Sequence, residues 1–342
     1  MFPALLEKLH RRQDLTVEEA AAAMVEIMEG RAQPAQIAGF LVALGMKGER
    51  PAEIVGLART MRARSTKLSR SFEPLFDTCG TGGDNAHTFN VSTVAALVLA
   101  ACGLRIAKHG NRSVSSRCGS ADLFESMGVN IAAAPEIVER CLDEAGIAFF
   151  FAPTFHPSMR HAAPARRDLG IRTAFNLLGP LTNPAGASRQ LVGVPRPELT
   201  ELVARSLAML GAERAWVVHG ADGLDEISTT GYTKVSECRD DAVNTFYVHP
   251  SDFMIPKAHP DALKGGGVSE NAEIARRILA GERGAPRDIV LLNAGVSLLI
   301  AGAVPSVAEG ITRGASAIDE GRAAAVLETL AQLSHAPAGA GV

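Results

Sequence analysis

The sequence predicts a small all-helical domain followed by a larger α/β domain, in which a mostly parallel central sheet is flanked by helices. Residues 1–70 show helical spacing of apolar residues with no β-rich run between them. From residue 71, short β-rich runs alternate with helical segments, the usual pattern of a parallel sheet. The chain has 342 residues, and a single core rarely grows past ~250–300 residues. Two domains are therefore expected.

The N-terminal region contains four short amphipathic segments: FPALLEKLHRR, TVEEAAAAMVEIMEG, QPAQIAGFLVALGMKG and PAEIVGLARTMRARS. Thr16 is placed to cap the second helix, and Glu19 completes a capping box. Gly30 and Gly48 are placed to end the second and third helices. We expect these helices to form a small bundle that offers an interface to a second subunit.

The larger region supplies strands and helices in turn. Strands are expected in FEPLFD, LRIA, IAFFF, AWVVHG and NTFYVHP, and helices in STVAALVLAACG, PEIVERCLDEAG and PELTELVARSLAMLG. Ser92 is placed to cap the first of these helices. Residues 269–335 are mostly helical, and their apolar run IVLLNAGVSLLIAGAV is too short and too polar to span a bilayer, so it predicts a buried helix.

The expected domain boundaries follow from this pattern. The helical domain covers 1–70, the α/β domain covers 71–335, and 336–342 forms a disordered tail. The proline- and glycine-rich segment near 160–190 breaks the alternation, so we expect it to cross back to the helical bundle.

Composition excludes several classes of protein. The net charge is -3 and aromatic residues make up 5%, so neither a nucleic-acid surface nor an anionic membrane is an expected partner. The five cysteines are widely spaced with no C-x-x-C, which argues against a disulfide framework or a zinc site. The charged N-terminus lacks the pattern of a signal peptide, and a cytoplasmic protein is expected.

A glycine-rich loop, GTGGD at 80–84, follows one expected strand and precedes a helix start. Glycines there expose main-chain N–H groups, and the helix start adds further donors, both of which favour phosphate. The pattern is neither a Rossmann fingerprint nor a Walker loop, and a plain turn explains it about as well. Asn90, Ser92 and Thr93 strengthen the interpretation as an anion site.

A second polar loop, KHGNRSVSSRCGSAD at 108–122, follows the next strand. It contains a group of cationic, amide and hydroxyl side chains: Lys108, His109, Asn111, Arg112, Ser113, Ser115, Ser116 and Ser120. Loops at the carboxyl ends of neighbouring parallel strands face the usual ligand crevice of an α/β sheet. The alternative is a solvated surface loop.

An acidic loop, VVHGADGLDEIST at 217–229, follows a further strand and contains Asp222, Asp225 and Glu226. Adjacent carboxylates at a strand end suit Mg²⁺, whose shell phosphate oxygens can complete. Because neighbouring side chains point in different directions, Asp225 and Glu226 could serve two ions. The alternative is an ordinary acidic turn.

The segment 156–186 contains two histidines and four arginines: His156, Arg160, His161, Arg166, Arg167 and Arg172. Some of these arginines are expected to be structural, pairing with Asp168 or with helix ends. One of them beside LLGPLTNP could clamp a carboxylate at two points. Gly179 and Pro180 would give a flat wall suited to an aromatic ring.

Taken together, GTGGD…TFNVST, KHGNRSVSS…GSAD, HP…RR…GIRT.FNLLGPLTNP and HG.DGLDE resemble the anthranilate phosphoribosyltransferase family in order and spacing. The resemblance extends to about residue 335. It implies a nucleoside phosphorylase/phosphoribosyltransferase-like fold, Mg²⁺ dependence and a homodimer joined through the helical domain. The implied reaction is the second step of tryptophan biosynthesis from chorismate: 5-phosphoribosyl-1-pyrophosphate and anthranilate give N-(5-phosphoribosyl)anthranilate and pyrophosphate.

The resemblance also implies three sets of site residues. The sugar pyrophosphate would be held by Gly80, Gly82, Gly83, Asp84, Thr88, Asn90, Ser92, Thr93, Lys108 and Ser120. Anthranilate would be lined by Gly80, His109, Asn111, His156, Arg166 and Gly179, and Mg²⁺ would be held by Ser92, Asp225 and Glu226. The departures are small: Cys118, NAH at 85–87, and a glycine ending LNAG.

No acid or base catalyst is assigned, because the aromatic amine is already neutral at pH 7. Positioning by Arg166 and Lys108 is expected to do most of the work. One rival is a nucleoside phosphorylase of the same broad fold, which would not need Arg166 or the acidic pair. Another is a non-catalytic relative that binds nucleic acid, which would want a basic surface.

Overall fold

The computed structural model describes residues 1–84, 86–113 and 117–337. Ser115 and Ser116 of the second polar loop, Asn85 of the NAH departure and most of the expected C-terminal tail lie outside the described residues.

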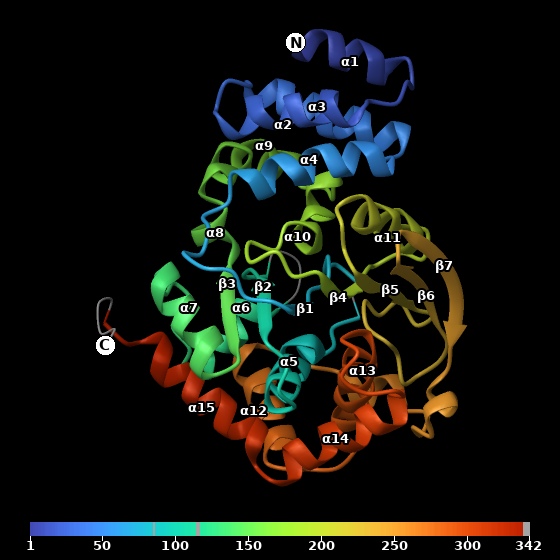
Figure 1. Ribbon diagram of the computed structural model, residues 1–342. Helices are drawn as coiled ribbons and strands as arrows, with labels where there is room; N and C mark the ends of the chain where they lie inside the picture. Colours follow the sequence, from blue (N-terminus) through green and yellow to red (C-terminus); the bar gives the residue numbers. More distant parts are fainter. Residues whose placement is uncertain (85, 114–116, 338–342) are drawn as a thin grey trace.

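The four predicted N-terminal helices are present as α1 (Phe2–His10), α2 (Val17–Met28), α3 (Pro34–Lys47) and α4 (Pro51–Ala63). They form the upper part of the molecule in Figure 1. The predicted capping box exists, because Thr16 Oγ1 accepts a hydrogen bond from the Glu19 N–H at 3.2 Å and Glu19 Oε2 accepts one from the Thr16 N–H at 2.8 Å. Gly30 follows α2 with φ +71°, where a side chain would be strained.

The described residues form a seven-stranded sheet in the order β3-β2-β1-β4-β5-β6-β7. The strands are β1 (Phe76–Thr78), β2 (Ile106–Gly110), β3 (Ile147–Phe151), β4 (Arg189–Gly193), β5 (Arg214–Gly220), β6 (Thr233–Arg239) and β7 (Ala242–Val248). The first five of these in the sheet order are mutually parallel, and β6 and β7 form an antiparallel hairpin against β5. The mostly parallel sheet is therefore confirmed.

The sequence analysis did not predict β4 and β6. The residues of β4, RQLVG, directly follow the proline- and glycine-rich segment, and β6, TKVSECR, has few apolar residues. Both strands exist because they pair with β5 on either side, so tertiary pairing outweighs their weak local preference.

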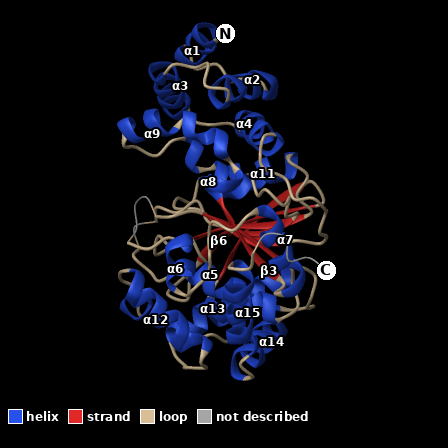
Figure 2. Ribbon diagram, turned by 90° about the vertical axis from the view of Figure 1, so that its left-hand side faces the viewer, coloured by secondary structure: helices blue, strands red, loops and turns tan. Residues whose placement is uncertain are grey.

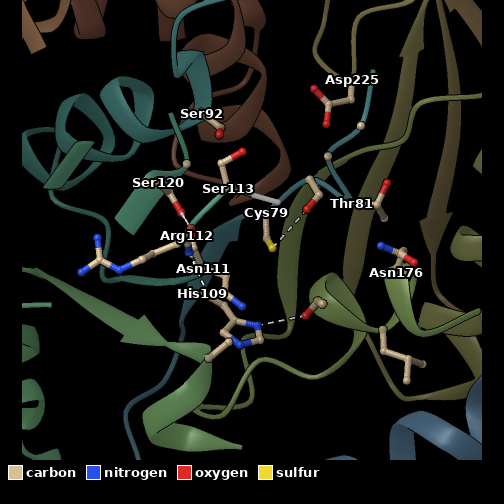
Figure 3. Close-up of a pocket in the computed structure, with 18 of the residues that line it drawn as sticks. Cys79, Thr81, Ser92, His109, Asn111, Arg112, Ser113, Ser120, Asn176 and Asp225 are labelled. Atoms are coloured by element: carbon tan, nitrogen blue, oxygen red, sulfur yellow. Dashed lines mark hydrogen bonds between the residues drawn. The ribbon is translucent and has the colours of Figure 1, made fainter. Parts of the chain in front are cut away.

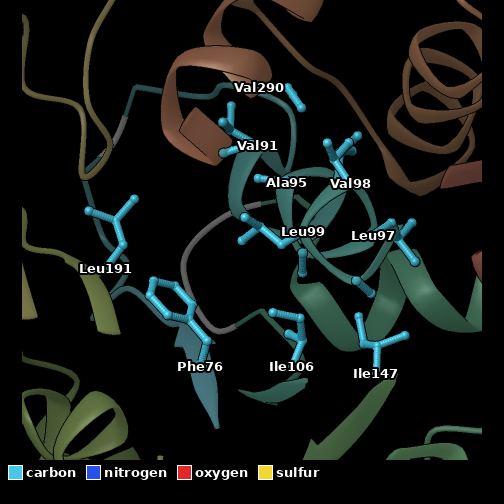
Figure 4. Close-up of a cluster of buried hydrophobic side chains, with 14 of the residues drawn as sticks. Phe76, Val91, Ala95, Leu97, Val98, Leu99, Ile106, Ile147, Leu191 and Val290 are labelled. Atoms are coloured by element: carbon cyan, nitrogen blue, oxygen red, sulfur yellow. The ribbon is translucent and has the colours of Figure 1, made fainter. Parts of the chain in front are cut away.

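Helices cover both faces of the sheet (Figure 2). On the face away from the bundle lie α5 (Val91–Ala101), α13 (Ala285–Ile300), α14 (Val307–Asp319) and α15 (Arg322–Ser334). Further helices are α6 (Ser120–Ser126), α7 (Pro135–Glu144), α11 (Leu199–Met209) and α12 (Val268–Leu279). In Figure 4, α5 packs Val91, Ala95 and other apolar side chains near residues of the neighbouring strands.

The apolar run at 289–304 is the buried helix that was predicted, since α13 is buried along most of its length. A methyl group at Gly295 would lie 2.8 Å from Ile311 Cγ1 and 2.9 Å from Ile311 N, so the glycine that ends LNAG allows α13 to approach α14 closely. None of the described helices has the length and hydropathy needed to cross a membrane.

The segment after β3 packs against the helical bundle. It contains three short helices, α8 (Ala152–Phe155), α9 (Ala163–Leu169) and α10 (Leu178–Leu181), and two 3-10 turns at Pro157–His161 and Ala174–Asn176. Its apolar residues Ala162, Ala165 and Phe175 belong to one core with the bundle and with α11. This segment therefore spans the space between the bundle and the carboxyl ends of the strands.

Candidate active site

One cavity of about 620 Å³ lies where the carboxyl ends of β1, β2 and β5 face the crossing segment. Every residue that the sequence analysis assigned to the sugar pyrophosphate, to anthranilate or to Mg²⁺ lines it, and Figure 3 shows several of them. Residues from four separate stretches of the chain thus meet in one place. Asp222 and Pro180, considered in the sequence analysis, are not among the lining residues.

The glycine loop is close-packed against protein groups as well as open to the cavity. A methyl group at Gly80 would lie 2.8 Å from Asp225 Oδ2, and one at Gly83 would lie 1.6 Å from Arg172 Nη1. Gly82 has φ +62° and no neighbouring atom within 4 Å of such a methyl group. The glycines therefore make room for Asp225 and Arg172, and only Gly82 faces open space.

The start of α5 differs from the prediction that Ser92 caps it. Asn90 occupies the cap position and Ser92 is the second helical residue. The Ser92 N–H instead donates to Glu226 Oε1 at 3.0 Å, so a carboxylate from the acidic loop takes the place of the expected capping hydroxyl. Thr93 Oγ1 is buried and has no hydrogen-bond partner among the described residues.

Asn90 joins three parts of the site. Its Nδ2 donates to the carbonyl oxygen of Cys118 at 3.0 Å, and its Oδ1 accepts from Asn271 Nδ2 of α12 at 3.1 Å. Thr88 forms an isolated bridge with Lys264. These contacts fix the residues between the glycine loop and α5 against the second polar loop.

Lys108, on β2, is a buried cation at the base of the cavity. Its side chain is 2% exposed, and Nζ donates to the carbonyl oxygen of Thr78. The buried Asp77, on the neighbouring strand β1, accepts hydrogen bonds from the His109 N–H at 3.2 Å and from Asn183 Nδ2 at 2.8 Å. Burial raises the pKa of Asp77 to about 6, and the Lys108 charge opposes that rise.

Asp225 and Glu226 are half-buried carboxylates that both line the cavity. Burial raises the pKa of Asp225 and the charge of Asp84 raises it further. Burial also raises the pKa of Glu226, with Asp225 as the next cause. Three carboxylates near one another in a half-buried site are stabilised by a cation, and their hard oxygens are the ligands that Mg²⁺ prefers.

Asp222, which the acidic loop also contains, has a structural role. Its side chain accepts hydrogen bonds from Ser228 Oγ at 2.5 Å, from the Leu224 N–H at 3.2 Å and from Thr230 Oγ1. These bonds hold the turn that presents Asp225 and Glu226. Within the described residues, no group of three or more His, Cys, Asp or Glu side chains is arranged to hold a metal ion.

Two histidines form the opposite wall. His109 Nδ1 lies 2.9 Å from the carbonyl oxygen of Gly179, His156 Nε2 lies 3.0 Å from that of Thr182, and the ring centroids are 5.2 Å apart. A carbonyl can only accept, so each of these nitrogens carries the proton. Burial lowers the pKa of His109 to about 3 and that of His156 to about 4, so both rings are neutral.

Arg166 is one of the arginines that line the cavity without a carboxylate partner among the described residues. Its guanidinium carbon lies 5.9 Å from the centroid of the Phe175 ring, and burial lowers its pKa. No ion pair or hydrogen bond joins it to a described residue. Arg167 pairs with Asp168 at 3.9 Å on the surface, as expected for one of the structural arginines.

Some residues of the second polar loop have structural contacts, and others lie at the wall of the cavity. Arg112 pairs with Asp122 at 2.9 Å and with Glu125 at 2.8 Å. Ser120 Oγ donates to the Asn111 carbonyl oxygen at 3.5 Å, close to the wall of the cavity. Four further residues line the cavity to which no ligand was assigned from the sequence: Arg172, Thr81, Asn176 and Met61. Of these, Arg172 lies in the GIRT motif, which could have indicated that it belongs to the site.

A helical bundle set on an α/β domain, with a glycine loop and a half-buried acidic pair on one cavity, defines a glycosyltransferase. The model for the α/β domain of the Glycosyl transferase family matches residues 73–324, and the model for its helical bundle domain matches residues 3–65. The class of the protein is thus the one that the fold and the site indicate.

Individual relatives narrow the class to one family. A Moorella thermoacetica protein named anthranilate phosphoribosyltransferase is 53% identical over 96% of this chain and 97% of its own length. The Thermus thermophilus enzyme of that name has a crystal structure with 44% identity and a TM-score of 0.90, covering 97% of this chain and 99% of that one. A Saccharomyces cerevisiae structure in complex with PRPP and Mg is 28% identical, with a TM-score of 0.89 over 97% of both chains. This chain belongs to the anthranilate phosphoribosyltransferase family.

Proposed function

We propose that this protein transfers the 5-phosphoribosyl group of 5-phosphoribosyl-1-pyrophosphate to the amine of anthranilate, with release of pyrophosphate, as the second step of tryptophan biosynthesis from chorismate. The observation that carries the proposal is the shared cavity. A glycine loop, a buried lysine and an acidic pair line one part of it, and an unpaired arginine with two neutral histidines lines the other.

The donor part of the cavity would hold the sugar pyrophosphate. The main-chain N–H groups of the glycine loop are suited to phosphate oxygens. The first N–H groups of α5 are already bonded within the protein, since that of Ser92 donates to Glu226 Oε1 at 3.0 Å and that of Thr93 donates to the Asn90 carbonyl oxygen at 3.1 Å. The residues proposed to contact this substrate are Gly80, Gly82, Gly83, Asp84, Thr88, Asn90, Ser92, Thr93, Lys108 and Ser120. The buried, unpartnered Thr93 hydroxyl supports the proposal, because such a group is stabilised by a polar ligand.

Asp225 and Glu226 would hold Mg²⁺, with help from Ser92. These two half-buried carboxylates repel one another. A bound divalent cation would reduce that repulsion. Bound Mg²⁺ supplies positive charge where the leaving pyrophosphate gains negative charge. The protein offers only part of a ligand shell, which leaves positions for substrate oxygens.

The acceptor part would hold anthranilate between His109, Asn111, His156, Arg166 and Gly179, with Gly80 at the boundary. The Arg166 guanidinium, free of a protein carboxylate, is suited to the carboxylate of the substrate. The neutral histidines place no positive charge beside the amine. Catalysis then rests on orienting that amine toward the sugar carbon, with no protein acid or base.

We further propose that the protein is a cytoplasmic homodimer joined through the helical domain, taken as residues 1–70, with 71–335 as the catalytic domain. Met46 on α3 is 75% exposed and Met1 is 53% exposed, which supports an apolar contact there. The five cysteines are buried and none of them forms a disulfide, which suits a reducing compartment. Light scattering on the full chain tests the dimer, and a monomer at micromolar concentration would contradict it.

One assay tests the activity itself. Anthranilate fluorescence should fall when the protein, Mg²⁺ and phosphoribosyl pyrophosphate are mixed, and the loss should require all three. A parallel assay with phosphate and a pyrimidine nucleoside should show no turnover. Fluorescence that stays constant, or turnover of the nucleoside, would overturn the proposal.

A further inference from the structure

A second arginine of the crossing segment reaches the donor part of the cavity. Arg172 lies between α9 and the 3-10 turn at Ala174–Asn176, and it lines the cavity. Its Nη2 donates to the carbonyl oxygen of Thr81 at 3.0 Å. Its guanidinium covers Gly83 so closely that a methyl group there would lie 1.6 Å from Nη1. The charge of Arg172 is therefore placed directly on the glycine loop.

Most of the hydrogen-bonding capacity of Arg172 is unused. A guanidinium has five N–H donors, and the bond to Thr81 is its single hydrogen bond to the described residues. Burial lowers the pKa of Arg172, and the charges of Asp225 and Asp84 oppose that shift, so both carboxylates are near. Neither approaches within ion-pair distance among the described contacts. The remaining donors can bind an anion that rests on the glycine loop.

Of the four arginines of this segment, Arg160, Arg166 and Arg172 line the cavity, and Arg166 and Arg172 lie at different parts of it. Arg166 lies in the last turn of α9, beside Phe175. The chain then reverses at Gly170, which has φ +61°. Arg172 follows that turn and contacts Thr81, and neither arginine pairs with a described carboxylate. One short segment thus offers one free guanidinium to each substrate.

We propose that Arg172 is a catalytic residue of the donor side, which binds the pyrophosphate group and stabilises it as it leaves. The bond from ribose C1 to the pyrophosphate oxygen breaks and its electron pair stays on that oxygen. The amine lone pair forms the new C1–N bond, and the amine releases one proton to water. Arg172 stays protonated throughout and donates hydrogen bonds to the oxygens that gain charge.

This assignment rests on the proposed function, and it differs from a purely structural role. If Arg172 only held Thr81 in place, its loss would loosen the glycine loop, and charge at position 172 would not matter. A direct contact makes the pyrophosphate affinity depend on that charge. The two roles are separated by comparing Arg172→Ala with Arg172→Lys, because lysine keeps the charge but loses the planar fork.

The experiment measures binding as well as turnover in four proteins: wild type, Arg172→Ala, Arg172→Lys and Arg167→Ala. Arg167 is the matched control, since it lies in the same segment with its side chain 79% exposed and paired with Asp168. Calorimetry with magnesium pyrophosphate gives the affinity for the leaving group. Steady-state assays give KM for each substrate, and thermal melting checks the fold.

In Arg172→Ala we expect the affinity for pyrophosphate and the KM for the sugar pyrophosphate to weaken about 10- to 100-fold, as for the loss of one or two charge-assisted hydrogen bonds. The anthranilate KM should change less than about threefold, a shift below 1 kcal/mol. Arg172→Lys should recover part of the loss, and Arg167→Ala should match wild type.

Two results would overturn the inference. One is unchanged pyrophosphate affinity in Arg172→Ala; the other is equal weakening in the alanine and lysine variants, which would leave Arg172 as a support for Thr81. A wild-type protein that binds magnesium pyrophosphate but makes no product would refute the proposed function instead. The binding comparison would then still decide whether Arg172 contacts pyrophosphate.

Discussion

The donor and acceptor parts of the cavity are built in different ways. The donor part consists of loops at the carboxyl ends of β1, β2 and β5 and the start of α5, so the sheet fixes it. Half of the residues proposed for the acceptor part lie on 152–181, a run of short helices and turns that packs with the helical bundle in one core. The proposed phosphate recognition thus belongs to the most regular part of the fold, and half of the proposed anthranilate recognition belongs to the least regular part.

This difference has a functional consequence. The Asp77 carboxylate and the Lys108 amine are buried among strands, where small movements are costly. Arg166 and His156 instead depend on how the crossing segment packs between the two domains. We therefore expect changes in the donor part to abolish chemistry, and changes in the acceptor part to alter the affinity for one substrate.

The largest effect is expected for Asp225→Asn combined with Glu226→Gln. Both changes remove negative charge from the metal site, so turnover should fall by about 1,000-fold or more, the loss of at least ~4 kcal/mol. Turnover across a magnesium titration measures this. Asp240→Asn is the control, because its side chain is 86% exposed on the turn between β6 and β7. Wild-type activity of the double variant at low Mg²⁺ would reject the metal role.

Arg166→Ala should weaken anthranilate binding without weakening binding of the sugar pyrophosphate. Loss of the contact to the carboxylate is expected to cost about 2–4 kcal/mol, which raises the anthranilate KM roughly 30- to 1,000-fold. The KM for the sugar pyrophosphate should stay nearly unchanged. Equal effects on both constants would show that the two parts are not independent.

Gly193→Ala tests whether the donor part depends on the strand that supports the acidic loop. The added methyl group would lie 1.6 Å from the Asp225 carbonyl oxygen, so the acidic loop must move. We expect the apparent affinity for Mg²⁺, measured from turnover across a magnesium titration, to weaken about 10- to 100-fold, similar to the loss of one charged contact. Gly231→Ala is the matched control, since nothing lies within 4 Å of its added methyl group. A variant with the magnesium dependence of wild type would show that the loop tolerates the displacement.

The smallest effect is a pH dependence confined to the donor part. The raised pKa values of Asp225 and Glu226 mean that Mg²⁺ must displace protons as the pH falls. Below the raised pKa, the apparent magnesium affinity should drop by up to about tenfold per pH unit for each proton displaced. Anthranilate affinity should show no imidazole titration near the ordinary histidine pKa, because His109 and His156 are already neutral. Calorimetry in two buffers measures the released protons, and magnesium affinity independent of pH would contradict the assignment.

The same contrast explains what the sequence could predict. The glycine loop, Lys108 and the acidic pair were found because each follows a strand, and parallel strands bring their carboxyl ends to one edge. The strands β4 and β6 were missed because pairing with β5, and not their own residues, determines them. The structural role of Asp222 could not be predicted, because its bonds to Ser228 and Thr230 depend on the turn that follows it.

The acceptor part was predicted through family resemblance more than through residue patterns. Nothing in the spacing of 156–186 distinguishes Arg166 from Arg167, which are adjacent in the sequence. Only the packing of α9 places Arg166 near Phe175 inside the cavity and leaves Arg167 on the surface beside Asp168. The site of Arg172 depends likewise on the turn at Gly170.

The most direct measurement is a crystal structure of the full chain with phosphoribosyl pyrophosphate, Mg²⁺ and a fluorinated anthranilate. We predict that the pyrophosphate rests on Gly82 and Gly83, that the metal contacts Asp225 or Glu226, and that the anthranilate carboxylate faces Arg166. Electron density for the phosphates beside His156, or for the aromatic ring on the glycine loop, would contradict the division of this cavity into donor and acceptor parts.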